Sequence, residues 1–147
     1  MTPAYKIAIT ACGTYFLVGL LTGVWKYRKI MTSPDAAAPI YVDIAHRAAL
    51  LYSFACLLIA EFTKWTGYTE RVNSILVAVQ VVYFGLAMLP YIVHGWLNDT
   101  DNQLKPPFRL GNGELPGWLI SSFMVTLVIA ELGGFAVMFA GFVRTQF

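Results

Sequence analysis

The chain has 147 residues, of which 58% are apolar and only 12% are charged, and its formal net charge is +2. A soluble domain of this composition would expose apolar patches large enough to cause aggregation, so the composition excludes an ordinary soluble domain and favours lipid as the solvent. The small and scattered positive charge also excludes a nucleic-acid-binding surface, so we expect no nucleic acid as a partner.

Four apolar stretches are long enough to cross a bilayer. We expect helices over residues 5–25, 44–63, 72–96 and 117–143, because a spanning helix needs about 20 apolar residues. Backbone groups find no hydrogen-bonding partner in lipid, so such spans are helical. The sequence therefore predicts an all-α, single-domain, integral membrane four-helix transmembrane bundle whose main partner is the lipid bilayer.

The connections between these helices bear on the orientation. Residues 30–43 and 97–116 form long loops on one side, and residues 64–71 form a short turn on the other side, together with both termini. Lys26, Arg28, Lys29, Arg47, Lys105 and Arg109 lie on the long-loop side, and Lys6, Lys64, Arg71 and Arg144 on the other. Because basic residues concentrate on the cytoplasmic side, this distribution favours both termini outside by a small margin.

The first expected helix carries Gly19 and Gly23 in a G-x-x-x-G pattern, and the fourth carries Gly134 and Gly141. Small residues let membrane helices approach closely. We expect these glycines at helix contacts, either within the chain or between the subunits of a homo-oligomer.

The second expected helix begins with Asp43, His46 and Arg47. A neutral imidazole is a common ligand for metals and for haem iron, so His46 is a candidate metal ligand. The alternative is an interfacial histidine that is hydrogen-bonded to a loop. Arg47 is expected to extend its charge outward to the interface.

The third expected helix aligns its hydrogen-bonding side chains along one face. At about 100° per residue they fall within an arc of roughly 80°, and they are Asn73, Gln80, Tyr83, Tyr91 and His94. Hydrocarbon cannot satisfy such groups, so this face should point into the bundle or into a polar cavity. For Asn73 and Gln80 we expect interhelical hydrogen bonds. For Tyr91 and His94 a ligand or cofactor role is equally compatible with the pattern.

Two histidines are expected at a similar depth in the membrane. His46 begins its helix and His94 ends another on the long-loop side, with Tyr91 beside His94. Such an arrangement suits a metal or haem site. There is no C-x-x-C-H attachment motif, so any haem would be held non-covalently.

The fourth expected helix carries Glu131 near its middle. A charge at this depth is expensive, and such residues are usually functional or paired. We expect its partner to be the polar face of the third helix or a basic group of a neighbouring subunit.

The run from Ala45 to Tyr52 (AHRAALLY) resembles the opening of the second helix of bacterial styrene oxide isomerases, small four-helix membrane enzymes that hold haem b. Aligned without a gap, the family's haem-ligating histidine falls on His46 and its functional tyrosine on Tyr91. Residues 113–117 (GELPG) are also similar to the family, which has an acidic residue, a leucine and a glycine there. The likeness spans residues 15–147 in hydrophobic pattern and loop lengths, with few identical residues.

The resemblance implies a trimeric protein of the bacterial inner membrane that binds haem b through His46. It implies that small apolar epoxides are opened to aldehydes, with ferric haem as the Lewis acid. Tyr91 would hydrogen-bond the developing oxyanion. Tyr52 stands where the family has an asparagine that holds the epoxide oxygen, so Tyr52 is the candidate for that role.

His94 has no counterpart in the family. As a second iron ligand it would close the open coordination position and convert a catalyst into an electron carrier or sensor. The alternatives to an isomerase are therefore a non-enzymatic haem- or lipophile-binding protein and an accessory subunit of a membrane complex. A fainter likeness, in size and span number, is to the trimeric membrane family of glutathione transferases and leukotriene synthases, but the E-x-x-x-x-x-N pattern of that family is missing.

Overall fold

The computed structural model describes residues 1–147 and consists of four long helical segments, each long and apolar enough to cross a membrane. These are α1 (Pro3–Thr32), α2 (Ile40–Phe62), α3 (Glu70–Leu97) and a fourth segment from Gly117 to Gln146. The fourth segment comprises α4 (Gly117–Val128), the π-helical turn η1 (Ile129–Gly133) and α5 (Gly134–Gln146). The prediction of an all-α integral membrane protein with four spanning helices is confirmed.

Helix α1 extends seven residues beyond its expected end at residue 25. It begins at Pro3 with the N-cap Thr2, whose hydroxyl accepts a hydrogen bond from the Tyr5 N–H at 3.3 Å. Its last two turns carry the basic cluster, and Lys26 forms an ion pair with Asp43 of α2 at 2.5 Å. Charged side chains mark where a helix leaves hydrocarbon, but they do not end it, because long basic side chains reach water from a helical backbone.

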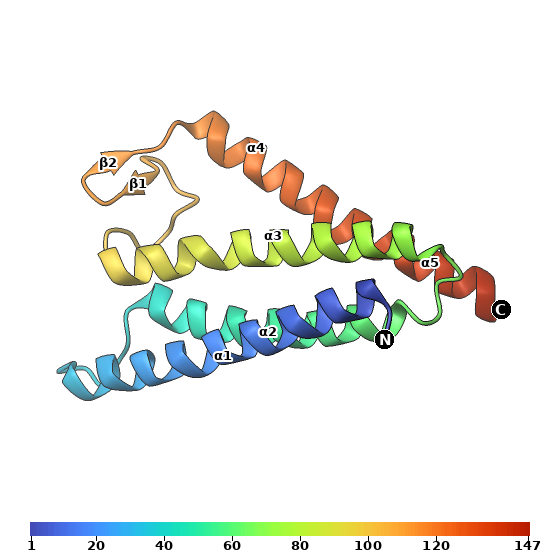
Figure 1. Cartoon of the computed structure of the whole chain (residues 1–147). Helices are drawn as coiled ribbons and strands as arrows, with labels where there is room; N and C mark the ends of the chain where they lie inside the picture. The colour runs from blue at the N-terminus through green and yellow to red at the C-terminus, as the bar shows by residue number, and fades with distance from the viewer.

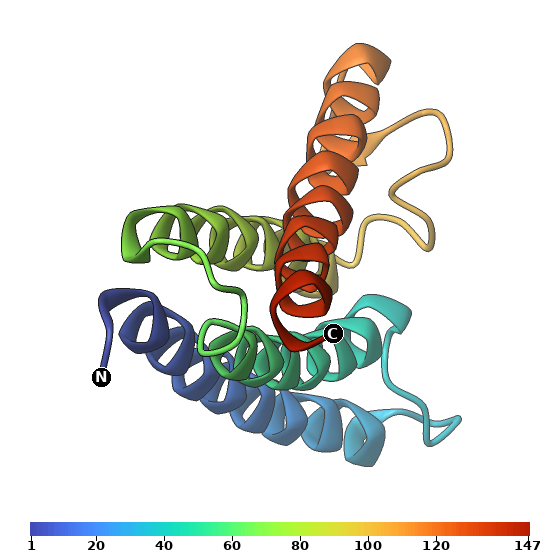
Figure 2. The ribbon, with the colours of Figure 1, turned by 90° about the vertical axis from the view of Figure 1, so that its right-hand side faces the viewer.

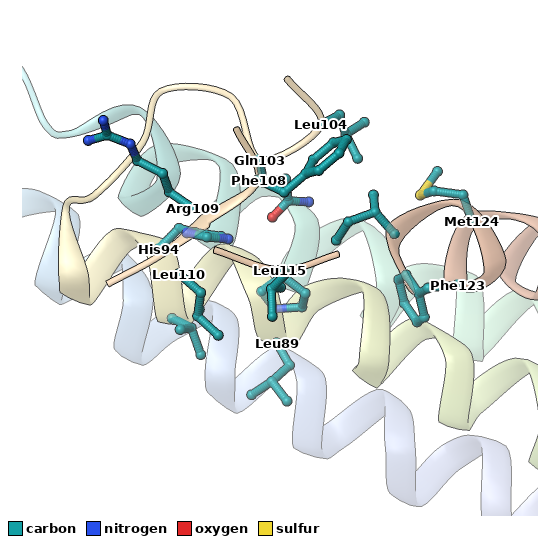
Figure 3. Close-up of a pocket in the computed structure, with 13 residues that line it drawn as sticks. Leu89, His94, Gln103, Leu104, Phe108, Arg109, Leu110, Leu115, Phe123 and Met124 are labelled. Carbon is teal, nitrogen blue, oxygen red and sulfur yellow. The ribbon is translucent and has the colours of Figure 1, made fainter. Parts of the chain in front are cut away.

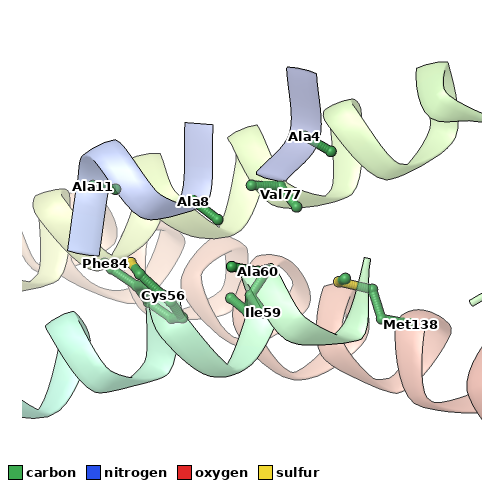
Figure 4. Close-up of a cluster of buried hydrophobic side chains, with 9 residues drawn as sticks. All are labelled: Ala4, Ala8, Ala11, Cys56, Ile59, Ala60, Val77, Phe84 and Met138. Atoms are coloured by element: carbon green, nitrogen blue, oxygen red, sulfur yellow. The ribbon is translucent and has the colours of Figure 1, made fainter. Parts of the chain in front are cut away.

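Helices α1, α2 and α3 lie side by side and form the closest-packed part of the molecule (Figures 1 and 2). The buried core between them also includes Met138 of α5 (Figure 4); its residues are Ala4, Ala8, Ala11, Cys56, Ile59, Ala60, Val77, Phe84 and Met138. The alanines of α1 recur every three or four residues, so one face of this helix is smooth and approaches its neighbours closely.

The G-x-x-x-G pattern lies at the contact between α1 and α2, within one chain. A Cβ atom added at Gly19 would lie 2.6 Å from Cδ2 of Leu50, and one added at Gly23 would lie 2.9 Å from Cε1 of His46. Both distances are too short for a real contact, so these positions require glycine as long as Leu50 and His46 keep their places.

The fourth segment approaches the other helices at its α5 end and diverges from α3 toward the long loop (Figures 1 and 2). Thr145 near the end of α5 donates a hydrogen bond to the carbonyl oxygen of Trp65 at 2.5 Å, and Gly141 packs against Thr66 and Tyr68. Helix α4, by contrast, contains no buried residue.

The long connection between α3 and α4 is more ordered than the sequence indicates. Helix α3 ends at Asn98, which adopts the left-handed conformation with a φ of 50°. The strands β1 (Arg109–Leu110) and β2 (Gly113–Glu114) then form a small antiparallel pair. Gly111 has a φ of +60°, which places a glycine where the tight turn of this hairpin needs one.

Candidate functional site

The polar face of α3 points into the protein, as its spacing predicts. Asn73, Gln80 and His94 are buried, and Tyr83 and Tyr91 are half-buried. Asn73 accepts a hydrogen bond from the Thr66 hydroxyl at 2.9 Å and donates one to the Thr63 carbonyl oxygen at 3.3 Å. Asn73 therefore holds the short turn between α2 and α3 instead of bonding across to another helix. The expected bond between helices is made by Gln80, whose Nε2 donates to Sδ of Met138 in α5 at 3.3 Å.

His94 lies in the last turn of α3 and is paired with a carboxylate. Its Nδ1 lies 2.7 Å from Oδ1 of Asp99, and Oδ2 of Asp99 accepts a hydrogen bond from the Gly111 N–H at 2.5 Å. Burial alone would raise the pKa of Asp99, but the hydrogen bonds from His94 and from the Gly111 N–H outweigh it and hold the pKa below its usual value. Because a carboxylate only accepts, Nδ1 of His94 carries the proton of this bond.

Tyr91 and His94 are brought together around Tyr41, the second residue of α2. The Tyr41 ring stacks on the Tyr91 ring at a centroid distance of 6.1 Å and an interplanar angle of 18°. Its centroid lies 5.2 Å from that of the His94 imidazole. The Tyr41 hydroxyl also accepts a hydrogen bond from the backbone N–H of Gln103 at 2.5 Å. One aromatic residue thus links α2, α3 and the long loop.

Neither Tyr41 nor Asp99 is predicted as a site residue from the sequence, because each lies outside the helix bounds expected there. Tyr41 precedes Tyr52 by eleven residues, which is about three helical turns, so the two share a face of α2. That periodicity would have identified Tyr41 if the helix had been predicted to begin at residue 40. For Asp99, the only signal is its position shortly after a helix-terminal histidine.

Tyr52, Tyr91 and Glu131 lie deeper in the bundle and close to one another. The Tyr52 ring stacks on Phe84 at 4.7 Å, and its hydroxyl faces the Glu131 carboxyl group, with Tyr91 nearby. Oε1 of Glu131 is buried and has no hydrogen-bonding partner. The side chain that faces the Glu131 carboxyl group is thus Tyr52 of α2, whereas the expected polar face of α3 contributes only Tyr91 nearby.

His46 lies elsewhere, against α1. Its Nδ1 is 2.8 Å from the carbonyl oxygen of Gly19, and its ring packs over Gly23. His46 and Tyr52 are six residues apart, so at about 100° per residue they project from α2 roughly 120° apart. One chain therefore brings Tyr91 together with His94 and Tyr52, but it does not bring His46 into that group.

A cavity of about 250 Å³ lies between α3, the long loop and α4, where α4 diverges (Figure 3). Its lining is mostly apolar, and the only hydrogen-bonding side chains in it belong to His94, Gln103 and Arg109. Most of the lining is supplied by Leu89, Pro90, Val93, Leu104, Phe108, Leu110, Leu115, Ile120, Phe123 and Met124. The cavity is thus a half-open apolar pocket with polar groups on its α3 and loop walls.

No group of three or more His, Cys, Asp or Glu side chains is placed to hold a metal ion.

Comparison with protein-family models, with curated proteins and with solved structures gives no match.

Proposed function

We propose that this integral membrane protein binds haem b through His46 and isomerises small apolar epoxides. The observation that carries the proposal is the hydrogen bond from Nδ1–H of His46 to the Gly19 carbonyl oxygen at 2.8 Å. Histidines that ligate a metal characteristically donate their other ring N–H to a carbonyl or carboxylate oxygen, which fixes the tautomer and orients the ring. This bond leaves the lone pair of His46 on Nε2, the atom that would ligate iron.

The surroundings of His46 fit a residue that would hold haem iron. The imidazole is half-buried, and Nε2 makes no hydrogen bond within the chain. Gly23 leaves the space that the ring occupies, since an added Cβ would lie 2.9 Å from Cε1. The ring is therefore positioned by two contacts from α1, while the nitrogen that could bind iron stays free.

Bound haem would supply a Lewis-acidic iron that activates the epoxide oxygen. The tyrosines of the deeper cluster suit the remaining task, because their hydroxyl groups can donate hydrogen bonds to a developing oxyanion in a site that excludes water. Tyr91 and Tyr52 are the candidates, and Glu131 beside Tyr52 can hold the orientation of that hydroxyl.

The proposal requires more than one copy of the chain. His46 faces α1, whereas Tyr52 and Tyr91 face the interior between α2 and α3. A site that combines them needs His46 of one subunit and the tyrosines of another. We infer a homo-oligomer, and the resemblance to the isomerase family favours a trimer.

The absorption spectrum of the detergent-purified protein, expressed with ample haem, tests the ligand. We expect a Soret band that shifts on addition of cyanide or imidazole and that is lost in His46→Ala. His94→Ala is the matched control and should retain the band. A colourless wild-type protein, or a His46→Ala variant with an unchanged band, would refute the ligand assignment.

Turnover of styrene oxide by the haem-loaded protein tests the reaction. We expect an aldehyde product, and we expect Tyr91→Phe to lower kcat while the Soret band is unchanged. The removal of one oxyanion-stabilising donor typically costs about 10²–10³ in kcat. Haem-loaded protein with an accessible iron but no turnover of apolar epoxides would refute the proposed isomerase activity without contradicting the proposed haem site.

The second candidate is non-enzymatic, either a haem- or lipophile-binding protein or an accessory subunit of a membrane complex. It is favoured because polar side chains of the α3 face make structural hydrogen bonds. Asn73 bonds to Thr66 and Thr63, and His94 holds the long loop through its bond to Asp99. A Soret band of bis-ligated character with no response to cyanide would support this candidate.

A further inference from the structure

We propose that the cavity between α3, α4 and the long loop binds a small, neutral, apolar compound that carries one hydroxyl group, with His94 and Gln103 as its polar partners. This site is separate from His46 and goes beyond the proposed haem chemistry. It is carried by the shape of the cavity, by its lining and by two polar side chains that have bonding capacity left over.

The lining sets the size and polarity of the ligand. Leu89, Phe108 and Phe123 are among the apolar side chains that surround the space (Figure 3). The cavity volume of about 250 Å³ exceeds the roughly 150 Å³ of an engineered apolar cavity that binds benzene. A ring with one or two substituents therefore fits.

His94 supplies the first polar partner. Its side chain is only 5% exposed, and it lines the cavity. Nδ1 is committed to Asp99 at 2.7 Å, so in the neutral imidazole the lone pair lies on Nε2. A buried histidine held by a carboxylate in this way offers its second nitrogen as an acceptor in a fixed orientation.

Gln103 supplies the second polar partner. Its Oε1 is buried and has no hydrogen-bonding partner, although the residue itself is held by the bond from its backbone N–H to the Tyr41 hydroxyl at 2.5 Å. A buried acceptor that is left unsatisfied is costly, so such an atom in a native protein calls for a ligand or a water. A hydroxyl group can donate its single proton to the Gln103 Oε1, or it can donate to Nε2 of His94 while its oxygen accepts from the Gln103 amide N–H.

The remaining polar residue argues for a neutral ligand. The guanidinium of Arg109 points away from the Gln103 amide and from the apolar side chains (Figure 3), and its residue is exposed. Asp99 already places one negative charge behind His94. An anionic ligand would therefore lack a cation inside the cavity, whereas an alcohol or phenol needs none.

The test uses fluorine NMR on the full chain in lipid nanodiscs, with 4-(trifluoromethyl)phenol as the probe and 4-(trifluoromethyl)toluene as its partner without a hydroxyl. Partitioning into empty nanodiscs is subtracted for each. We expect saturable binding of the phenol that is about five- to tenfold tighter than that of the toluene, the gain typical of satisfying a buried acceptor.

The variants locate the binding. Gln103→Leu removes an atom that has no partner, so the protein should fold normally and the preference for the phenol should fall several-fold. Gln146→Leu, at the other end of the molecule, is the matched control and should preserve the preference. Met124→Trp fills the cavity from α4 and should weaken both probes. Equal affinity for the two probes, or a preference that Gln103→Leu leaves intact, would overturn the proposal.

A phenol can also bind haem iron, so the same titration is run on His46→Ala. A preference that persists in this variant supports the cavity and is independent of whether the proposed haem function holds. A preference that disappears with His46 would place the phenol at the His46 site and overturn the proposal.

Discussion

Substitution of Gly23 by alanine tests whether Gly23 positions the His46 ring, because its effect can be compared with that of an alanine placed elsewhere in α1. The added Cβ would lie 2.9 Å from Cε1 and 3.1 Å from Nδ1 of His46. The imidazole would have to move, and its 2.8 Å hydrogen bond to the Gly19 carbonyl oxygen would lengthen or break. Gly13→Ala is the matched control, because an added Cβ at Gly13 meets nothing within 4 Å.

The size of the effect follows from three contributions. Overpacking costs about 1–3 kcal/mol and loss of the hydrogen bond about 0.5–1.5 kcal/mol, while alanine gains up to about 1 kcal/mol of helix propensity over glycine. We therefore expect Gly23→Ala to lower the free energy of unfolding by about 2 kcal/mol. Gly13→Ala should raise it by a few tenths to about 1 kcal/mol.

The assay is reversible unfolding in mixed bicelles by SDS, followed by tryptophan fluorescence, together with the ¹⁵N shift of the His46 Nδ1. The proposed haem site adds a second readout, because a displaced imidazole should weaken the Soret band. A Gly23→Ala variant that is as stable as Gly13→Ala and leaves the Nδ1 shift unchanged would show that Gly23 does not position His46.

Three further predictions concern the polar groups of α3 and the long loop. Asp99→Ala should speed amide exchange across residues 97–116, since it leaves the Gly111 N–H and His94 without their acceptor, at a cost of about 1–3 kcal/mol. The pKa of Asp99 in the folded protein lies below its ordinary value of 3.8. The stabilisation of the loop by the ionised Asp99 carboxylate is therefore present above pH 3.8 and is lost as the pH falls through the lower folded-state pKa. Amide exchange in the loop that already becomes faster between pH 7 and pH 5 would contradict this prediction. Asn73→Leu breaks two hydrogen bonds and should lower the unfolding free energy by about 1–3 kcal/mol in the same SDS titration. Gln80→Met loses the bonds from Nε2 to the Leu76 carbonyl oxygen and to Sδ of Met138, but it also removes the buried Oε1 that has no partner, so it should change the unfolding free energy by less than about 1 kcal/mol.

The spans could be predicted because each depends on a local property, the length of an uninterrupted apolar run. The inward direction of the α3 face could be predicted too, since buried Asn73, Gln80 and His94 follow from periodicity alone. Charged residues do not mark the helix boundaries: α1 continues past Lys26 to Thr32, and α2 begins at Ile40, before Asp43. The extension of α2 to residue 40 is what brings Tyr41 onto the bundle.

The depth of His46 and His94 in the membrane can be predicted from the sequence, but the direction in which each side chain points cannot. Depth in the membrane can be estimated from the position of a residue along its helix, and this is why His46 and His94 were expected at one level. The direction in which each points depends on which neighbour lies on which side, and a single sequence does not contain that information. His46 faces Gly19 of α1, whereas His94 faces Tyr41 and Asp99.

The π-helical turn at Ile129–Gly133 has a consequence for how the fourth segment can vary. A π-turn closes its hydrogen bonds over five residues instead of four, so it holds one more residue than the α-helical turn it replaces. The faces of α4 and α5 are therefore out of phase by about 100° relative to an unbroken α-helix. Deleting one residue from this turn would rotate Phe123 and Met124 away from the cavity and leave Thr145 on Trp65. The orientations of α4 and α5 are thus set separately. Helix α5 packs on the bundle, and the face that α4 turns toward the cavity can change without disturbing the packing of α5.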